Sequence, residues 1–302
     1  MAKSRSVRQI PVTKEKAMPV SSSCPKCGGT PNEALRNCPT CSNDLGCPNV
    51  RAALVPEELE ALANRLRTAS NNAKQANLAS EFAQLRAAIK NFSKVVVAMP
   101  LLYARTFLND SRILYAGYEK LVGGESRVPA PSANDRDRAS VAGKFFGSYA
   151  ANIRYGVLSL DGTSLESYGT AFMTLRDVAV ENRVSFLHEN TYVFATDHQL
   201  KTQGKIPNGY KCVWSNRADL VVSKLEPQLT KGSTTAEWSR QLVQQAANRH
   251  DERCVEAHIF DGFNVDSIES VKFSQGIDKR DKLDISSIQE LMANRPRAGV
   301  PK

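Results

Sequence analysis

Several features that would assign a function or a compartment at sight are missing from this sequence. None of its apolar runs approaches the roughly 20 residues that cross a bilayer, and residues 1–23 are basic and polar, without the apolar segment of a secretory signal. A glycine-rich phosphate loop, a Gly-x-Ser-x-Gly elbow and a His-Glu-x-x-His metal motif are all absent. These absences predict a cytoplasmic protein with no membrane partner and remove the standard signatures of phosphate-binding, serine-hydrolase and zinc-protease sites.

Histidine is also scarce, and charge is spread unevenly. The 302 residues contain four isolated histidines, and the net charge is +9. Residues 1–53 carry eight Lys or Arg against three Asp or Glu, a surplus of five, and residues 272–302 carry seven against four, a surplus of three. Basic ends around a more neutral middle favour weak attraction to nucleic acid or an acidic partner, although they serve solubility equally well.

Cysteine supplies the most specific pattern. Four of the seven cysteines form two Cys-x-x-Cys pairs, Cys24 with Cys27 and Cys38 with Cys41, separated by ten residues. Two such pairs complete a tetrahedral shell of four thiolates, which suits structural Zn²⁺ and leaves no open position for catalysis. Reduced cysteines in a loop and a disulfide pair are the alternatives. Because residues 21–49 have almost no apolar side chains, this segment should be unfolded without a metal.

Apolar periodicity predicts a helical region over residues 54–130. Pro56 is placed to open a helix, and two heptad-like stripes follow out of phase. Either one long helix has a stammer, or two helices form a hairpin near residues 71–77. An intramolecular seam is favoured over a dimeric coiled coil. The stripes consist of Leu59, Leu62, Leu66, Ala69, Ala73 and Ala76, then Phe82, Leu85, Ile89, Phe92, Val96 and Met99.

The rest of the chain, residues 131–302, has the pattern of an α+β domain rich in short strands. Helices are expected over residues 132–146 and 236–248, and strands where β-branched and aromatic residues lie between turn signals. The expected strands are residues 153–160, 171–175, 191–195, 220–224, 254–260 and 267–273. With a disordered basic tail over residues 1–22 and the zinc module over 23–53, the chain divides into four parts.

Three stretches of the C-terminal part resemble the ADP-ribosyltransferase fold, over about residues 140–273. The third stretch is the most specific, because it combines a glutamate-bearing strand, a turn and a closing strand with an Ile-x-x-Val run. The resemblance implies a domain of mixed or antiparallel strands that takes NAD⁺ as a substrate. The stretches are Arg154 to Asp161, then Ser167-Tyr168-Gly169 with 172–176, 183–186 and Glu189-Asn190, and last 255–262 with 265–273.

The resemblance also implies roles for individual residues. Glu256, Tyr168 and Arg154 would be catalytic, with Tyr168 lining the nicotinamide pocket. The residues implied to hold NAD⁺ are Arg183, Ser185, Asn190 and Gly169.

The residue type and strand position of Glu256 also suit this chemistry. Cleavage of the nicotinamide–ribose bond passes through an oxocarbenium-like state, which a fixed carboxylate can stabilise. Glu256 shares a strand face with His258, and a carboxylate on an otherwise apolar strand is costly unless it has partners or a cleft. The alternative is an exposed glutamate on an edge strand.

These patterns predict an NAD-dependent ADP-ribosyltransferase of the toxin or anti-phage defence type. Its acceptor would be a nucleic acid or a protein, and an antitoxin or chaperone would be its partner. The competing hypothesis is a non-enzymatic zinc-ribbon protein that binds nucleic acid or a protein partner, with the C-terminal domain as a scaffold. NAD-dependent labelling separates the two, because only an enzyme transfers label or releases nicotinamide.

Overall fold

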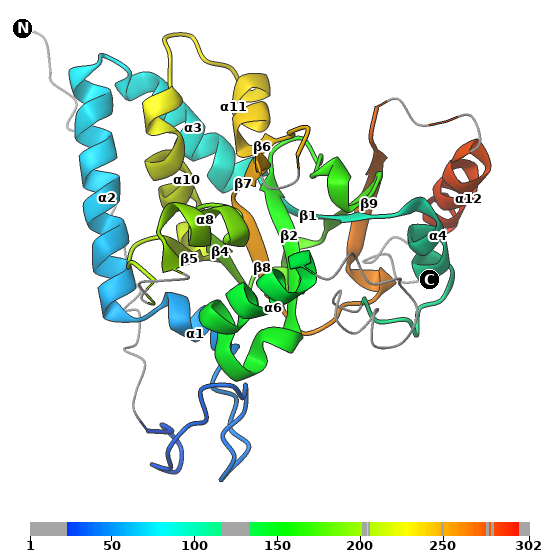
Figure 1. The fold of residues 1–302 in the computed structure, drawn as a ribbon, viewed down its shortest axis with the longest axis horizontal. Coiled ribbons are helices and arrows are strands. Elements are labelled where there is room, and N and C mark those ends of the chain that lie inside the picture. Colours follow the sequence, from blue (N-terminus) through cyan, green and yellow to red (C-terminus); the bar gives the residue numbers. More distant parts are fainter. Residues whose placement is uncertain are drawn as a thin grey trace, which may run out of the picture.

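A single antiparallel sheet organises the chain. The computed structural model describes residues 23–115, 133–200, 204, 206–248, 251–275, 278 and 281–295, without side chains for 133–139. Within these residues, seven strands pair in the order β5-β4-β8-β2-β1-β3-β9, each antiparallel to its neighbours (Figure 1). They are β1 (Lys94–Met99), β2 (Ile153–Ser159), β3 (Ala171–Leu175), β4 (Val184–Leu187), β5 (Lys211–Val213), β8 (Glu256–Phe260) and β9 (Ile268–Phe273). A separate pair joins β6 (Val243–Gln244) to β7 (Arg253–Cys254).

Helices pack against both faces of this sheet. The α-helices are α1 (Pro48–Ala53), α2 (Pro56–Gln75), α3 (Ala79–Phe92), α4 (Leu101–Asn109), α6 (Ala133–Phe146), α7 (Asp177–Val180), α8 (Thr191–Asp197), α10 (Arg217–Leu225), α11 (Thr235–Leu242) and α12 (Lys282–Ala293). Short 3-10 helices are η1 (Gly147–Asn152), η2 (Glu166–Tyr168), η3 (Trp214–Asn216), η4 (Glu226–Gln228) and η6 (Val265–Ser267). None of the helices in the described part combines the length and apolar character needed to span a membrane.

Two hydrophobic clusters divide the core. Because side chains alternate along a strand, Phe186 on β4 and its partner Ala257 on β8 face one cluster, together with residues of α2, α3 and α10. Ile153, Leu187 and Phe260 belong to the other, where α6 and α8 supply aromatic side chains such as Phe194. Strand β8 is therefore covered on both faces, and any polar group on it must find its partners inside the protein.

The helical region contains the expected hairpin and one strand that periodicity missed. Helices α2 and α3 are joined by a short turn containing Asn77, whose φ is 59°, so the hairpin alternative is confirmed. The second stripe does not continue as a helix: α3 ends at Phe92, which is 65% exposed, and Val95-Val96-Val97 lie in β1, inside the sheet between β2 and β3. Three consecutive β-branched residues favour a strand over a helix.

Because β1 lies between β2 and β3, residues 54–130 and 131–302 contribute to the same sheet. The strands expected over residues 153–160, 171–175, 254–260 and 267–273 and the helix near 132–146 are present within a few residues. The helix expected over 236–248 ends earlier, at Leu242. The expected disordered tail, residues 1–22, lies outside the described residues.

Two expected strands are helices. Residues 191–195 begin α8, because the Asn190 side chain accepts a hydrogen bond from the Tyr192 N–H and caps the helix. Residues 220–224 lie within α10, whose Leu220, Val221 and Val222 are fully buried. A short apolar run of this kind fits a buried helix as well as a buried strand, so only the surrounding packing decides.

Candidate functional site

The four-cysteine module repeats one local conformation twice. In the first turn, Gly28 N donates to Cys24 O at 2.9 Å and Gly28 has φ 70°; in the second, Ser42 N donates to Cys38 O at 2.9 Å and Ser42 has φ 57°. This left-handed residue reverses the chain after each Cys-x-x-Cys pair, and glycine adopts it without strain. Each turn thereby directs two sulfur atoms to the same side.

The sulfur atoms are spaced as a tetrahedral metal requires. Cys24 Sγ lies 3.7 Å from Cys41 Sγ, Cys27 Sγ lies 3.7 Å from Cys38 Sγ, and all four sulfur atoms lie within 4.8 Å of one another. Zinc with Zn–S bonds of about 2.3 Å separates its ligands by about 3.8 Å. All seven cysteines are free, so no disulfide competes. The residues present fit Zn²⁺, which would hold the two turns together.

The four thiols differ in how readily they ionise in this arrangement. Burial opposes ionisation of Cys38, but N–H groups of Cys41 and Thr40 and the neighbouring thiols lower the pKa of Cys38 to about 6. The Gly29 N–H favours the Cys27 thiolate, yet Cys41, burial and the remaining thiols raise the pKa of Cys27 to about 12. In this folded arrangement of the four thiols, the first proton therefore leaves Cys38.

The expected unfolding of the metal-free module predicts the proton release that accompanies metal binding. In an unfolded segment the four thiols have ordinary pKa values of about 8.5, so they are mostly protonated at pH 7.5 and binding of Zn²⁺ should release nearly four protons per ion. As the pH falls, protons compete for all four thiols and zinc affinity should fall steeply. Calorimetry in buffers of different ionisation enthalpy measures the released protons. Release of about two protons or fewer at pH 7.5 would contradict a ligand set of four thiolates formed from an unfolded segment.

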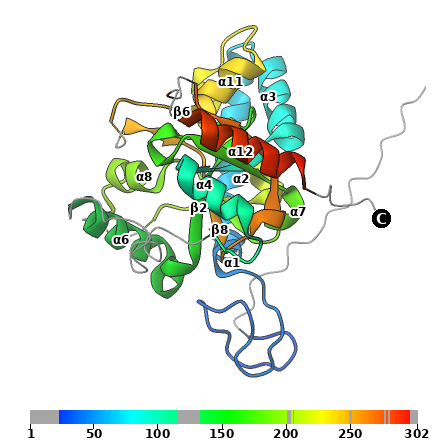
Figure 2. The same ribbon diagram turned by 90° about the vertical axis from the view of Figure 1, so that its right-hand side faces the viewer.

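One arginine ties the module to the body of the protein. Arg51 Nη2, from α1, donates to three backbone carbonyl oxygens of the loop between the turns, at 3.0 to 3.1 Å. Burial lowers the pKa of Arg51. By contrast, Arg36 and Asp44 form an exposed ion pair within the module. In Figures 1 and 2 the dark blue loops of the module project from the body.

Removal of the two arginines should therefore have unequal effects. Arg51→Ala is expected to weaken the loop over residues 32–35 by about 1.5 kcal/mol, because three carbonyl groups lose a charged donor. Arg36→Ala should cost at most about 1 kcal/mol, as exposed ion pairs do. Hydrogen exchange of the loop amides in the zinc-loaded protein measures both. Equal loss of protection in the two variants would show that Arg51 is not the tether.

The second candidate site surrounds Glu256. Strand β8 is central, between β4 and β2, so the exposed edge-strand alternative is wrong. The register pairs Glu256 with Val157 and Leu187, and its side chain points to the face covered by α6 and α8. Glu256 is only 9% exposed.

Three polar side chains converge there. The Glu256 carboxylate accepts hydrogen bonds from Thr191 N at 3.0 Å and from Thr191 Oγ1. His258 Nε2 lies 2.9 Å from Glu256 Oε2 and 3.1 Å from Thr191 Oγ1. The His258 ring packs edge-on against Phe146 and Tyr155. The carboxylate is thus held rigidly between a hydroxyl and an imidazole, surrounded by aromatic rings.

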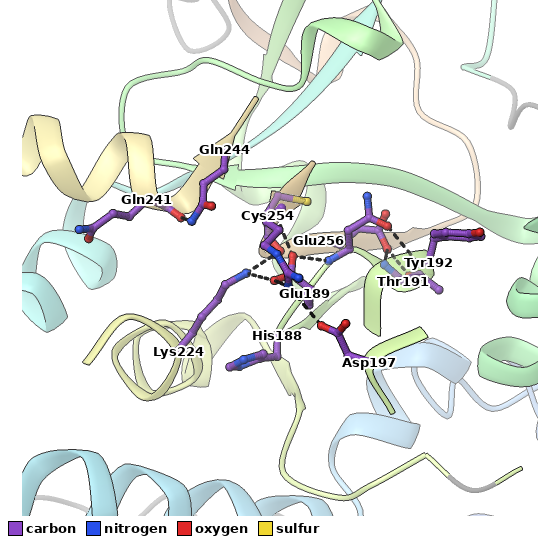
Figure 3. Close-up of polar contacts among 12 residues, drawn as sticks. His188, Glu189, Thr191, Tyr192, Asp197, Lys224, Gln241, Gln244, Cys254 and Glu256 are labelled. Atoms are coloured by element: carbon purple, nitrogen blue, oxygen red, sulfur yellow. Dashed lines mark hydrogen bonds and ion pairs between the residues drawn. The ribbon is translucent and has the colours of Figure 1, made fainter. Parts of the chain in front are cut away.

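A buried ion pair lies beside this cluster (Figure 3). The Glu189 carboxylate accepts hydrogen bonds from Lys224 Nζ at 3.0 Å and Cys254 N at 2.9 Å, and Arg253 Nη1 lies 3.3 Å away. Lys224 also donates to Cys254 O, so β7 is fixed to α10 just before Glu256. Lys224 is not among the predicted site residues, because the sequence pattern favours a strand over residues 220–224. The sequence signal that could have identified it is a lysine at the end of a buried apolar run.

Two of the residues implied to bind NAD⁺ lie next to Glu256. Ser185 pairs with His258 across β4 and β8, and its hydroxyl accepts from Asn49 Nδ2 at 3.1 Å. Asn190 precedes Thr191 and caps α8. Asn49 Nδ2 also donates to His258 O at 2.7 Å. Helix α1, which follows the four-cysteine module, thereby contacts the strand that carries Glu256.

The two arginines are not brought to Glu256. Arg154 pairs with Ile259, so it lies on the opposite face of the sheet from Glu256, and its Nη1 donates to the carbonyl oxygens of Ala151 and Ile153. The Arg183 guanidinium donates to the carbonyl oxygens of residues 179, 260 and 262. Burial lowers the pKa of Arg183. Both arginines satisfy the backbone at the end of the sheet, which sequence patterns do not reveal.

Tyr168 and Gly169 lie elsewhere in the fold. Tyr168 ends η2 and packs, half-buried, against the larger core cluster, which does not include the aromatic rings around His258. Gly169 has φ 146°, and a Cβ there would lie 2.0 Å from the Met99 carbonyl carbon. Glycine is needed at this position for close approach to β1, which accounts for it without a ligand.

No protein-family model and no curated protein sequence matches this chain.

Proposed function

We propose that this protein is an NAD-dependent ADP-ribosyltransferase with a structural zinc module. The observation that carries the proposal is the Glu256 carboxylate, which Thr191 and His258 hold in place on the central strand β8. A fixed, partly desolvated carboxylate stabilises a developing cation more strongly than a mobile one in water. The order of elements after it also supports the proposal: β8 carries the glutamate, a turn follows at Asp261, and β9 closes the opposite edge of the sheet.

The positions of the arginines narrow this proposal. Arg154 and Arg183 already donate hydrogen bonds to backbone carbonyl groups, so neither is assigned a contact with NAD⁺. Glu256 stabilises the ribose cation, while Thr191 and His258 are positioning residues that fix its carboxylate. The acceptor remains a nucleic acid or a protein.

The first test is whether the purified, zinc-loaded protein consumes NAD⁺. Nicotinamide release and transfer of label from NAD⁺ should both be detected with extracted nucleic acid and protein offered as acceptors. Label in one fraction identifies the acceptor class. A protein that neither binds nor cleaves NAD⁺ with both acceptors present would overturn the proposal.

The second candidate function is that of a non-enzymatic zinc-ribbon protein, and one observation favours it. The four-cysteine module projects from the body and is attached through α1 and Arg51, as a module that recognises a partner would be (Figure 2). The preceding residues 1–22 carry five Lys or Arg against one Glu, which suits a nucleic acid. Salt-dependent nucleic-acid binding that is lost with the metal, without NAD⁺ cleavage, would establish this function instead.

A further inference from the structure

A groove with a volume of about 850 Å³ lies between α2 and η3, and none of its lining residues belongs to the Glu256 cluster. One wall is formed by Leu59, Ala63 and Leu66, which recur along α2 at the spacing of a single helix face. Trp214 forms the opposite wall. Leu62, in the same stretch of helix, is buried in the core, whereas Leu59 and Leu66 are half-buried and Ala63 is exposed. The face of α2 formed by Leu59, Ala63 and Leu66 is therefore only partly covered by other elements among the described residues.

The wall opposite α2 is rigid. The Arg217 guanidinium lies 3.9 Å from the centre of the Trp214 ring. Arg217 is itself held by hydrogen bonds to Ser93 Oγ at 3.0 Å and Lys90 O at 2.7 Å. A groove whose walls are already fixed loses little conformational entropy when a ligand enters. The volume is also in the range of sites that bind ligands.

The charge of the groove is opposite to that of the protein. Its charged lining residues are Glu181 and Asp219, both acidic, although the whole chain carries a net charge of +9. Asp219 pairs with Arg86 at 2.7 Å. Within the described part of the chain, no cation pairs with Glu181. An incoming Lys or Arg would therefore meet an acidic group beside an apolar wall.

We propose that this groove binds a peptide segment of a partner protein that presents two or three aliphatic side chains to α2 and a Lys or Arg to Glu181. The aliphatic side chains cover the stripe from Leu59 to Leu66, and the cation selects the orientation of the segment. This proposal is independent of NAD⁺ chemistry, because no residue of the Glu256 cluster lines the groove.

The probe is a labelled amphipathic peptide of about 14 residues, roughly four helical turns, with leucines on one face and lysines beside them, and fluorescence anisotropy measures its binding to the full chain. A second peptide has glutamate in place of each lysine. The lysine peptide should bind at least tenfold more tightly. Because the protein is basic, its overall charge disfavours the lysine peptide, so this preference would have to come from a local acidic site.

Two neighbouring substitutions on α2 locate the site. Ala63→Arg places a long cationic side chain in the groove and should weaken lysine-peptide binding at least tenfold. Asn64→Arg adds the same charge at an exposed position outside the groove and should leave binding within twofold. Arginine is a good helix former, so both variants should fold. Glu181→Gln should reduce the preference for lysine over glutamate. Failure of the lysine peptide to bind, or equal effects of the two α2 variants, would overturn the proposal.

Discussion

Glu256→Gln should lower the rate of NAD⁺ consumption on the order of 10²-fold, because removal of one preorganised electrostatic group costs about that much. Glutamine keeps the size of the side chain and an oxygen that can still accept from Thr191 N, so the local structure should persist. The KM for NAD⁺ should change little, since the negative charge matters most when the ribose becomes cationic. Steady-state kinetics with nicotinamide release as the readout measures both parameters.

A matched variant separates chemistry from stability. Glu252 is another buried carboxylate, 2% exposed, and accepts a hydrogen bond from Ser167 Oγ at 2.6 Å. Glu252→Gln makes the same chemical change at a carboxylate held by Ser167 and should retain the wild-type rate. Thermal unfolding of both variants controls for folding. If Glu256→Gln only lowers stability and leaves turnover unchanged, the cluster of Glu256, Thr191 and His258 is structural.

Cys38→Ser should abolish stoichiometric zinc binding and unfold residues 23–46. Cys38 is 1% exposed and supplies one of the four converging sulfur atoms, so its loss would leave only three thiolates for a metal ion. Metal binding contributes on the order of 10 kcal/mol to structural zinc sites of this type, and the module has no core of its own to offset that loss. Metal analysis should give one zinc ion per wild-type chain and less than one tenth of that in the variant. Limited proteolysis should cut the module and spare the sheet.

Cys47→Ala is the control for this experiment. Cys47 is buried beside α1, but it does not belong to the group of four converging sulfur atoms. Its substitution removes a buried thiol and should leave one zinc ion per chain. Loss of zinc from Cys47→Ala, or full zinc retention in Cys38→Ser, would show that the ligand set is not the one assigned.

The metal site could be predicted from sequence because its geometry is local. Two Cys-x-x-Cys turns fix their own sulfur atoms through short-range hydrogen bonds, and a bound metal ion would join the two turns. The hairpin of α2 and α3, and strands such as β3, were predictable for the same reason: periodicity and turn residues act within a few positions.

Whether Arg154 and Arg183 reach Glu256 could not be predicted from the residues next to them in the sequence. Arg154 and Arg183 have the residue type of a pyrophosphate ligand, and only the strand register shows that Arg154 faces away from Glu256. Likewise, Glu256 and Thr191 are 65 residues apart in sequence and meet only because α8 packs over β8. Hydrogen-bond partners that come from distant elements leave no periodic signal in the chain.

Sequence patterns alone predict the cluster of four cysteines, the helical hairpin and the alternation that places Glu256 and His258 on one face of a strand. Each depends on chemistry within a single turn, helix or strand. Tertiary structure alone decided that β8 is central, that residues 191–195 and 220–224 are helical, and that β1 completes the sheet. The reason is physical: a short apolar segment is compatible with more than one backbone conformation, and the burial available against the rest of the chain selects among them.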